Sequence, residues 1–241
     1  MNVLAVDTSS GQGSLALGRD DGWCEVVALT AEWKSTTLHT ELVRLLARCG
    51  LKSGDIDGYA VASGPGTFTG LRIGLTAVKA FAEVHGKPIV PVSTLECLAV
   101  AGRNLLPDSF SGELAALLDA RRGQIFGALF RIEGQDLRPV ISDCVCSLSS
   151  FLERVDDALR GTLRNAQCTD VRFCATEMEL FSNQIGISGW TQAAILAVPP
   201  ILAGTLVRIG IERLKNGQVQ SAAAAEANYV RPSDAEIFWK G

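Results

Sequence analysis

A pattern of strand, aspartate, polar turn and strand occurs twice in this chain and limits the folds that it can adopt. The first copy, NVLAVDTSSGQGSLALGRDDG, contains Asp7, and the second, ELAALLDARRGQIFGALFRIEG, contains Asp119. In each copy an apolar run ends at the aspartate and a second apolar run follows a glycine-containing turn, which predicts a β-hairpin. A spacing of about 110 residues is far longer than the period of a solenoid, so the pattern indicates two similar lobes.

The other segments assign the rest of the chain to these lobes. After the first hairpin we expect a helix whose apolar stripe ends at Cys49, a strand at GYAVASG, a helix from Phe68 to about Val84, and a strand at KPIVPVS. An amphipathic helix at about 199–216 begins after two prolines and ends before a glycine. The predicted organisation is a first lobe over 1–106 together with the helix at about 199–216, a second lobe over 107–198, and a tail over 217–241 that docks back on the fold.

The predicted fold is α/β and two-lobed. Two lobes that each open with a hairpin carrying an acidic residue at its turn resemble the actin-like ATPase (ribonuclease H-like) fold of sugar kinases, Hsp70 and actin. In that fold the hairpin turns grip nucleotide phosphates, so Asp7 or Asp119 would hold a magnesium ion through water. The first functional hypothesis is therefore a stand-alone ATPase or kinase that uses these two aspartates.

Composition excludes several other classes. The net charge is −4 and no basic block is present, so tight binding of nucleic acid by this chain alone is not expected. The most apolar stretch, 193–207, contains two prolines and is too short to span a bilayer. The number of cysteines is odd and no Cys-x-x-Cys pair occurs, which predicts reduced thiols in a cytoplasmic protein without a membrane anchor. The seven cysteines are Cys24, Cys49, Cys97, Cys144, Cys146, Cys168 and Cys174.

The segment SGPGTFTGLRIG is rich in glycine and runs directly into a predicted helix. It lacks the lysine and the Gly-Lys-Ser/Thr ending of a phosphate-binding P-loop. Instead, Gly66, Gly70 and Gly74 recur every four residues, which removes side chains from one face and permits a close backbone approach. The approaching group is either this chain's own sheet or a helix of a partner protein, and the spacing alone does not distinguish the two.

Five motifs together resemble the TsaB family. They read VLAVDTSS, GPGTFTGLRIG, VSTLE, DARRGQIF and YVRPSDAE, and they follow the family's order over almost the whole chain. Two small departures are Thr67 in place of the usual serine and Gln124 in place of the more frequent glutamate. The TsaB family is the accessory member of the bacterial machinery that makes N6-threonylcarbamoyladenosine beside the anticodon of tRNAs reading codons that begin with A.

The resemblance implies a subunit without catalytic activity of its own. The related catalytic subunit, TsaD, holds a metal with two histidines four residues apart, and the matching positions here are Thr94 and Leu98. Neither residue suits a transition metal, so no metal site and no carbamoyl transfer are expected in this chain. The implied partners are a TsaD-like subunit and a TsaE-like ATPase, with tRNA reached only through the complex. No cofactor is expected, apart from nucleotide at the boundary of the assembled complex.

The resemblance also selects the surface on which partners are expected. TsaB-like proteins pair with TsaD through helices of the first lobe, and they form homodimers in isolation through an overlapping surface. His39, one step off the apolar stripe of its helix, is expected at the surface, and a polar contact in the subunit interface is the alternative. Asp7 is expected to cap its own turn unless it belongs to a vestigial nucleotide site with Asp119. The predicted interface comprises Leu38, Leu42, Leu45, Gly66, Gly70, Leu71, Gly74 and Phe81.

Two rival functions stay open at this point. The first is the stand-alone ATPase or kinase, which predicts ATP turnover that is lost in Asp7→Ala. The second is a homodimeric structural protein without a role in tRNA, which predicts normal tRNA modification in cells depleted of it.

Overall fold

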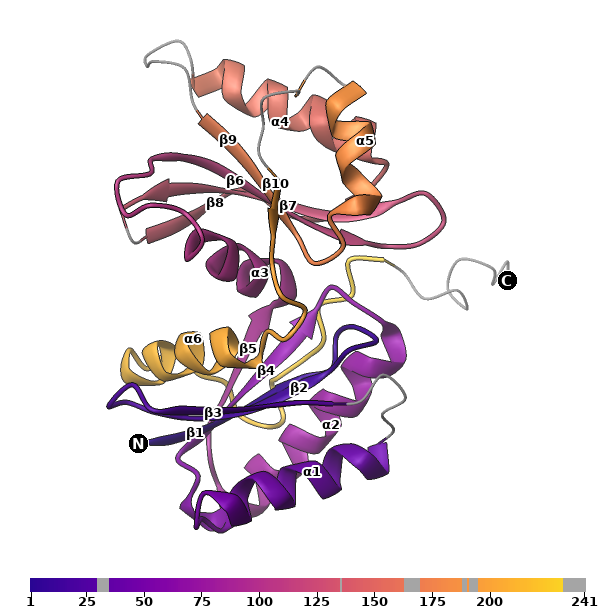
Figure 1. The fold of residues 1–241 in the computed structure, drawn as a ribbon. Coiled ribbons are helices and arrows are strands. Elements are labelled where there is room, and N and C mark those ends of the chain that lie inside the picture. The colour runs from indigo at the N-terminus through magenta and orange to yellow at the C-terminus, as the bar shows by residue number, and fades with distance from the viewer. Residues whose placement is uncertain (30–34, 135, 163–169, 188–189, 191–194, 232–241) are drawn as a thin grey trace. The chain divides into compact units, whose positions relative to one another are not determined.

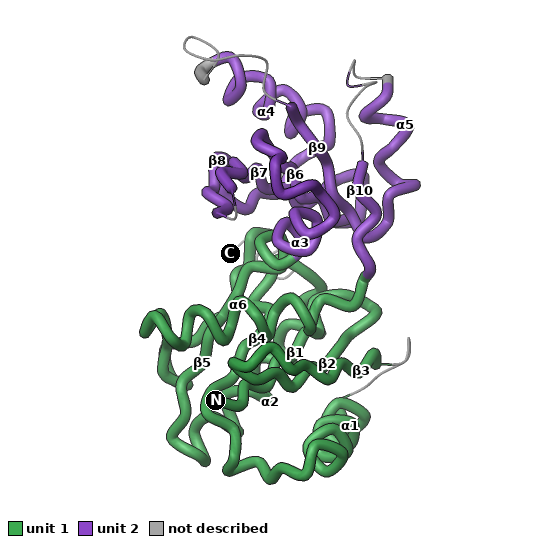
Figure 2. The backbone as a smooth tube through the Cα atoms, turned by 60° about the vertical axis from the view of Figure 1, so that its left-hand side comes forward, with its two compact units in different colours: residues 1–97, 200–241 green, residues 98–199 purple. Residues whose placement is uncertain are grey.

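The computed structural model divides into two compact units, residues 1–97 with 200–241 and residues 98–199 (Figure 2). The chain crosses from the first unit to the second inside helix α3, Thr94–Arg103. The sequence predicts this boundary at 106/107, whereas in the structure the second half of α3 packs in unit 2, where the Cys174 thiol donates to the carbonyl oxygen of Leu98. The structure describes residues 1–29, 35–134, 136–162, 170–187, 190 and 195–231.

Unit 1 contains a five-stranded sheet in the order β3-β2-β1-β4-β5. The first three strands are antiparallel, and β4 and β5 run parallel to β1. The β1–β2 ladder ends at the pair Asp7 and Ser14, so the predicted first hairpin carries its aspartate at the turn. The bounds are β1 Asn2–Asp7, β2 Ser14–Arg19, β3 Cys24–Ala28, β4 Gly58–Gly64 and β5 Ile89–Ser93.

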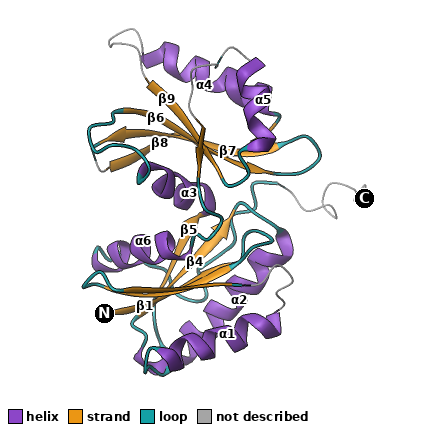
Figure 3. Cartoon of the chain, in the orientation of Figure 1, coloured by secondary structure: helices purple, strands orange, loops and turns teal. Residues whose placement is uncertain are grey.

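Helices cover both faces of this sheet (Figures 1 and 3). Helices α1 (Ser35–Arg48) and α2 (Phe68–His85) lie together on one face and share a hydrophobic core with β1 and β2. Helix α6 (Ala203–Lys215) lies on the other face, where strand glycines admit it: a Cβ on Gly18 would lie 2.9 Å from Val207. A short 3-10 turn at 53–55 precedes β4.

Unit 2 repeats the strand arrangement of unit 1. Its sheet has the order β10-β9-β6-β7-β8, with β6, β7 and β8 antiparallel and β9 and β10 parallel to β6. The β6–β7 ladder ends at the pair Asp119 and Ile125, in the position that Asp7 and Ser14 occupy in unit 1. The bounds are β6 Gly112–Asp119, β7 Ile125–Glu133, β8 Asp136–Cys146, β9 Asp170–Ala175 and β10 Ile195–Ala197.

Side chains alternate between the two faces of the sheet in unit 2, and helices pack on both faces. Ala115 and Leu117 of β6 face a core formed with α4 (Leu148–Thr162) and α5 (Glu179–Ile187). The opposite face carries Leu114 and Cys174, and both approach Gly102 of α3. The two sheets and their helices thus share one plan, as expected for the duplicated actin-like fold.

The described part of the tail packs on unit 1. Gln220 exchanges two backbone hydrogen bonds with Ile89 at the edge of β5. Further along, the N–H of Asn228 donates to the carbonyl oxygen of Ser63 at 2.7 Å, and Lys79 of α2 donates to the carbonyl oxygen of Ala225 at 3.0 Å. The bridge between Gln220 and Ile89 occupies part of the β5 edge, which would otherwise be open to pairing with another chain. None of the described helices is long and apolar enough to cross a lipid bilayer.

Candidate functional site

The glycine loop packs against the turn between β1 and β2. The N–H of Thr67 donates to the carbonyl oxygen of Ser9 at 2.7 Å, and the Thr8 hydroxyl donates to the carbonyl oxygen of Gly70 at 2.8 Å. A Cβ on Gly70 would lie 2.0 Å from the Thr8 carbonyl oxygen, and one on Gly66 would lie 2.4 Å from that of Ser9. Both distances are far inside van der Waals contact, so only glycine lets α2 begin this close to the turn.

The prediction that the loop glycines face a partner protein is therefore wrong. Gly70 and Gly74 are buried, and a Cβ on Gly74 would lie 2.1 Å from the Thr8 hydroxyl oxygen. Leu71, also assigned to the interface, is only 2% exposed. The repeat of small residues lets α2 pack closely against the β1–β2 turn of its own unit. The group that approaches these glycines therefore belongs to this chain and not to a partner protein.

The three leucines of α1 also belong to the core. Leu38, Leu42 and Leu45 are at most 1% exposed and pack against strand residues such as Leu15. For Leu45 a direct contact with a partner is therefore excluded in this folded chain. Leu38 and Leu42 differ from it, because they also form the floor of a surface groove.

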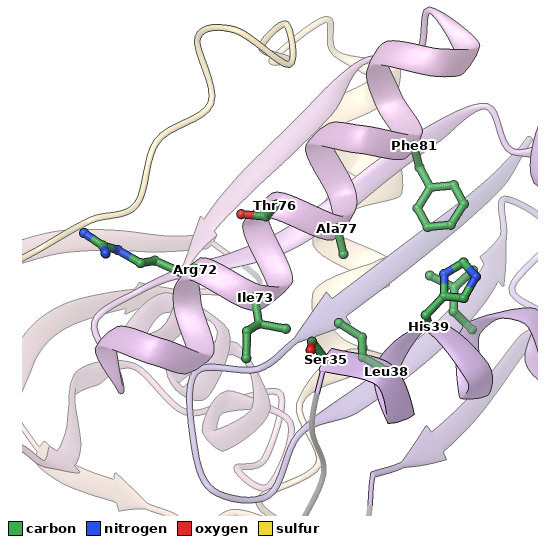
Figure 4. A pocket seen from close by; sticks show the side chains of 9 residues that line it. Ser35, Leu38, His39, Arg72, Ile73, Thr76, Ala77 and Phe81 are labelled. Atoms are coloured by element: carbon green, nitrogen blue, oxygen red, sulfur yellow. The ribbon is translucent and has the colours of Figure 1, made fainter.

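This groove runs between α1 and α2 and has a volume of about 330 Å³ (Figure 4). Leu38 and His39 point toward it from α1, and Ile73, Ala77 and Phe81 line it from α2. The lining is mainly apolar, so water in the groove gains little from contact with it and an apolar side chain would be favoured there. The complete lining is Ser35, Leu38, His39, Leu42, Arg72, Ile73, Thr76, Ala77 and Phe81.

Aromatic stacking holds one end of the groove in place. The His39 and Phe81 rings lie nearly parallel, at 11°, with their centroids 6.1 Å apart, and Tyr59 lies 6.3 Å beyond Phe81. The same two helices also expose Val43 and Val84, which are 51% and 78% accessible. Val43 lies on α1 and Val84 on α2, the two helices that form the groove.

The predicted interface and the groove share only part of their residues. Of its eight residues, Leu38, Leu42 and Phe81 line the groove. His39, expected at the surface with an interface contact as the alternative, also lines the groove, whereas the other lining residues were not among those predicted. Exposed valines on otherwise amphipathic helices are the sequence signal that could have located this surface.

A contact at the start of α2 joins the tail to the groove. The guanidinium of Arg72 stacks 3.8 Å from the Phe68 ring, and its Nε donates to the Tyr229 hydroxyl at 3.2 Å. The Phe68 and Tyr229 rings also pack against each other at 5.1 Å. Arg72 also lines the groove, so the contact with Tyr229 of the tail positions a polar side chain of the groove.

Asp7 lies beneath the β1–β2 turn and is 1% exposed. Its Oδ1 accepts hydrogen bonds from the backbone N–H of Ser9 at 3.0 Å and from the Ser9 hydroxyl at 2.7 Å. Its Oδ2 is buried and has no hydrogen-bond partner. Burial raises the pKa of the Asp7 carboxyl, and the two bonds from Ser9 oppose that shift. This environment gives the carboxyl the turn-forming role that its sequence context predicts.

The raised pKa of Asp7 makes stability depend on pH. Because the folded-state pKa lies above the ordinary value of 3.8, the native state binds the proton more tightly than the unfolded state, and stability falls as pH rises between these two pKa values. We expect Asp7→Asn, which keeps an oxygen for Ser9 and removes the charge, to raise the free energy of unfolding by about 1 kcal/mol or more at pH values above the folded-state pKa of Asp7.

This prediction is checked by urea denaturation from pH 4 to pH 8. The difference between the variant and the native chain should shrink toward acidic pH, where the native carboxyl is protonated. The amide nitrogen that replaces the unpartnered Oδ2 adds a cost that does not change with pH. The pH trend is therefore decisive, and a native chain that gains stability over the variant as pH rises would show that the ionised carboxylate is stabilising.

Asp119 occupies the matching position in unit 2 but has a different environment. Its Oδ1 accepts the backbone N–H of Arg121 at 2.7 Å, and its Oδ2 lies 3.1 Å from Nη1 of the same arginine. The carboxylate is therefore paired within its own turn. Neither aspartate presents a free, exposed oxygen, so the geometry gives the predicted vestigial nucleotide site no support.

The two positions aligned with metal-binding histidines lie in the interior. The Thr94 side chain is 2% exposed with a hydroxyl that has no partner, and Leu98 is fully buried. In the ranges that the structure describes, no group of three or more histidine, cysteine, aspartate or glutamate side chains could hold a metal ion. Burial raises the pKa of the Cys97 and Cys174 thiols, which makes both poor nucleophiles. Cys168 lies outside the described residues.

The sequence of this chain matches one family model and several known proteins. The family model described as "TsaD: tRNA N6-adenosine threonylcarbamoyltransferase" matches residues 29–230. The chain is 29% identical over 240 residues to the tRNA threonylcarbamoyladenosine biosynthesis protein TsaB of Bacillus subtilis, covering 99% of this chain and 98% of that protein. It is 26% identical to the TsaB protein of Haemophilus influenzae over 75% of this chain and 80% of the relative.

A solved structure shares the fold. YeaZ from Pseudomonas aeruginosa superposes with a TM-score of 0.74 and 22% sequence identity, over 95% of this chain and 100% of that chain. The match spans both units and agrees with the predicted two-lobed architecture.

Proposed function

Because the chain belongs to the TsaB family and acts in tRNA threonylcarbamoyladenosine biosynthesis, we propose that it is the non-catalytic subunit that binds and supports a TsaD-like transferase. The TsaD-like partner transfers the threonylcarbamoyl group to the adenosine beside the anticodon. A TsaE-like ATPase joins where the two subunits meet, and this chain reaches tRNA only within the assembly.

The observation that carries this proposal is the groove between α1 and α2. An amphipathic helix of a partner binds such a groove by inserting apolar side chains at helical spacing. Leu38 and Leu42 on the floor and the residues of α2 that line the groove would receive these side chains. In isolation a second copy of this chain would cover the same surface, which predicts a homodimer that the TsaD-like partner displaces.

The surroundings of the two hairpin aspartates also favour an accessory role. A magnesium-bound nucleotide requires carboxylate oxygens that can reach the hydration shell of the ion. Asp7 is buried beneath the β1–β2 turn, where Ser9 binds its Oδ1, and Asp119 is paired with Arg121. We therefore propose that this chain holds no nucleotide by itself and that any nucleotide binds at the boundary of the assembled complex.

Sedimentation of the purified chain, alone and mixed with its TsaD-like partner, tests the proposal. We expect a dimer alone and a heterodimer in the mixture. Cells depleted of this chain are expected to lose the modified adenosine, and re-expression should restore it.

Two results would overturn this assignment. A native chain that forms no complex with the TsaD-like protein would remove the accessory role, and ATP turnover sensitive to Asp7→Ala would then support the stand-alone ATPase. Unchanged tRNA modification after depletion would instead support a structural homodimer without a role in tRNA.

A further inference from the structure

The turn between β6 and β7 has an unusual backbone. Arg121, Arg122 and Gly123 have φ values of 63°, 56° and 71°. The left-handed region is sterically unfavourable for residues with a Cβ, and the residues that most often adopt it are glycine and asparagine. Two consecutive arginines therefore hold a conformation that smaller residues would adopt more easily. Strain of this kind at an exposed site points to a function for the side chains that are retained there.

Local contacts hold this turn in one shape. The N–H of Gln124 donates to the carbonyl oxygen of Arg121 at 3.1 Å, and the N–H of Ala120 donates to the carbonyl oxygen of Gln124 at 3.1 Å. Asp119 binds both the backbone N–H and the guanidinium of Arg121. The Arg121 side chain nevertheless remains 82% exposed. The turn thus presents a guanidinium to solvent from a defined backbone position.

We propose that Arg121 and Arg122 form a phosphate-binding turn that contacts the backbone of tRNA in the assembled complex. The inference rests on the proposed function, because this acidic chain lacks the charge to bind RNA alone. A guanidinium can donate two parallel hydrogen bonds to one phosphate, a geometry that lysine cannot reproduce. Preorganisation of the turn reduces the entropy lost when the phosphate binds.

The composition of the turn favours a phosphate over a protein surface. Arginine is also enriched at protein interfaces, but there it borders a core of buried apolar or aromatic side chains. Here Ala120 is 4% exposed, and the residues beyond it are arginine, arginine, glycine and glutamine. The turn offers charge and hydrogen-bond donors without an exposed apolar anchor. Contacts to phosphates position a protein on RNA without reading its sequence, as expected for an accessory subunit.

The test compares tRNA binding by the complete complex containing native chain or the double variant Arg121→Asn and Arg122→Asn. Asparagine tolerates the left-handed region, so the variant should fold with a thermal midpoint at or above that of the native chain. We expect an affinity for tRNA that is about tenfold to a hundredfold lower at low salt, and a log–log salt slope reduced by about 1 to 2. Fluorescence anisotropy at several salt concentrations measures both quantities.

A matched control removes two other exposed arginines of unit 2. Arg138 and Arg160 each pair with a nearby acidic side chain, as Arg121 does. Their double replacement by asparagine changes the net charge equally and should leave tRNA affinity within about twofold, because nonspecific charge effects fall off over a Debye length.

The outcomes separate this inference from the function on which it rests. A turn variant that assembles normally and keeps both its affinity and its salt slope overturns the phosphate-binding turn alone. A turn variant that no longer assembles assigns the arginines to a protein partner and equally overturns the RNA contact. Failure of the native chain to assemble would instead remove the proposed function.

Discussion

Ala77→Glu is expected to abolish association of this chain with a TsaD-like partner. Ala77 lines the groove between α1 and α2, beside Leu38 and Phe81. A partner helix that fills the groove would bury the new carboxylate among mainly apolar side chains. An unpaired buried charge costs several kcal/mol, so the dissociation constant should rise at least about a hundredfold. Sedimentation or titration calorimetry with the purified partner measures this change.

A matched substitution separates the groove from general effects of charge. Ala223 is exposed in the tail segment beyond α6, outside the groove, so Ala223→Glu should leave partner binding unchanged. Circular dichroism must show that both variants are folded. If Ala77→Glu is folded and still binds the partner with native affinity, the interface lies elsewhere and the groove has no part in it.

Gly70→Ala is expected to be the most damaging small substitution in unit 1. Its Cβ would lie 2.0 Å from the carbonyl oxygen of Thr8, and the contact is with backbone, which cannot rotate away. Relief requires α2 to move from the β1–β2 turn, breaking the hydrogen bond from the Thr8 hydroxyl. We expect the free energy of unfolding to fall by about 3 kcal/mol or more. Urea denaturation followed by circular dichroism provides the measurement.

Gly186→Ala supplies the control for helical glycines. Gly186 lies in α5, and a Cβ there would meet no atom within 4 Å. Because alanine favours helix over glycine, this change should be neutral or should stabilise the chain by up to about 1 kcal/mol. If Gly70→Ala behaves like Gly186→Ala, the close approach of α2 to the turn is not a constraint on the fold.

Much of the fold could be predicted from local pattern. Both hairpins, the strand before the glycine loop and helix α2 follow from hydrophobic period and glycine placement, and the equal strand order of the two sheets bears out the duplicated plan. Helices α3, α4 and α5 were not predicted. Helix α3 follows β5 without an intervening loop, so no turn residue marks where strand becomes helix, and the boundary between units inside it leaves no signal in the sequence.

The candidate site was predictable only to the level of helices. Apolar positions such as Leu38 and Leu45 share one stripe of α1, and a helical period reports that the stripe is buried without reporting what buries it. The structure shows the sheet beneath Leu45 and the groove above Leu38. The same limit applies to Gly70. The four-residue spacing of the glycines predicts that another segment approaches closely, but it does not identify that segment.

The sequence by itself determined the duplicated plan, the family and the turn role of Asp7, because each depends on residues that are neighbours in the chain. Only the tertiary structure decided which faces are internal. The glycines contact Thr8 and Ser9, more than fifty residues earlier in the chain, and the groove forms where α1 and α2 meet. Such contacts arise from packing of distant segments around a shared core, and local periodicity carries no information about the partner in a contact.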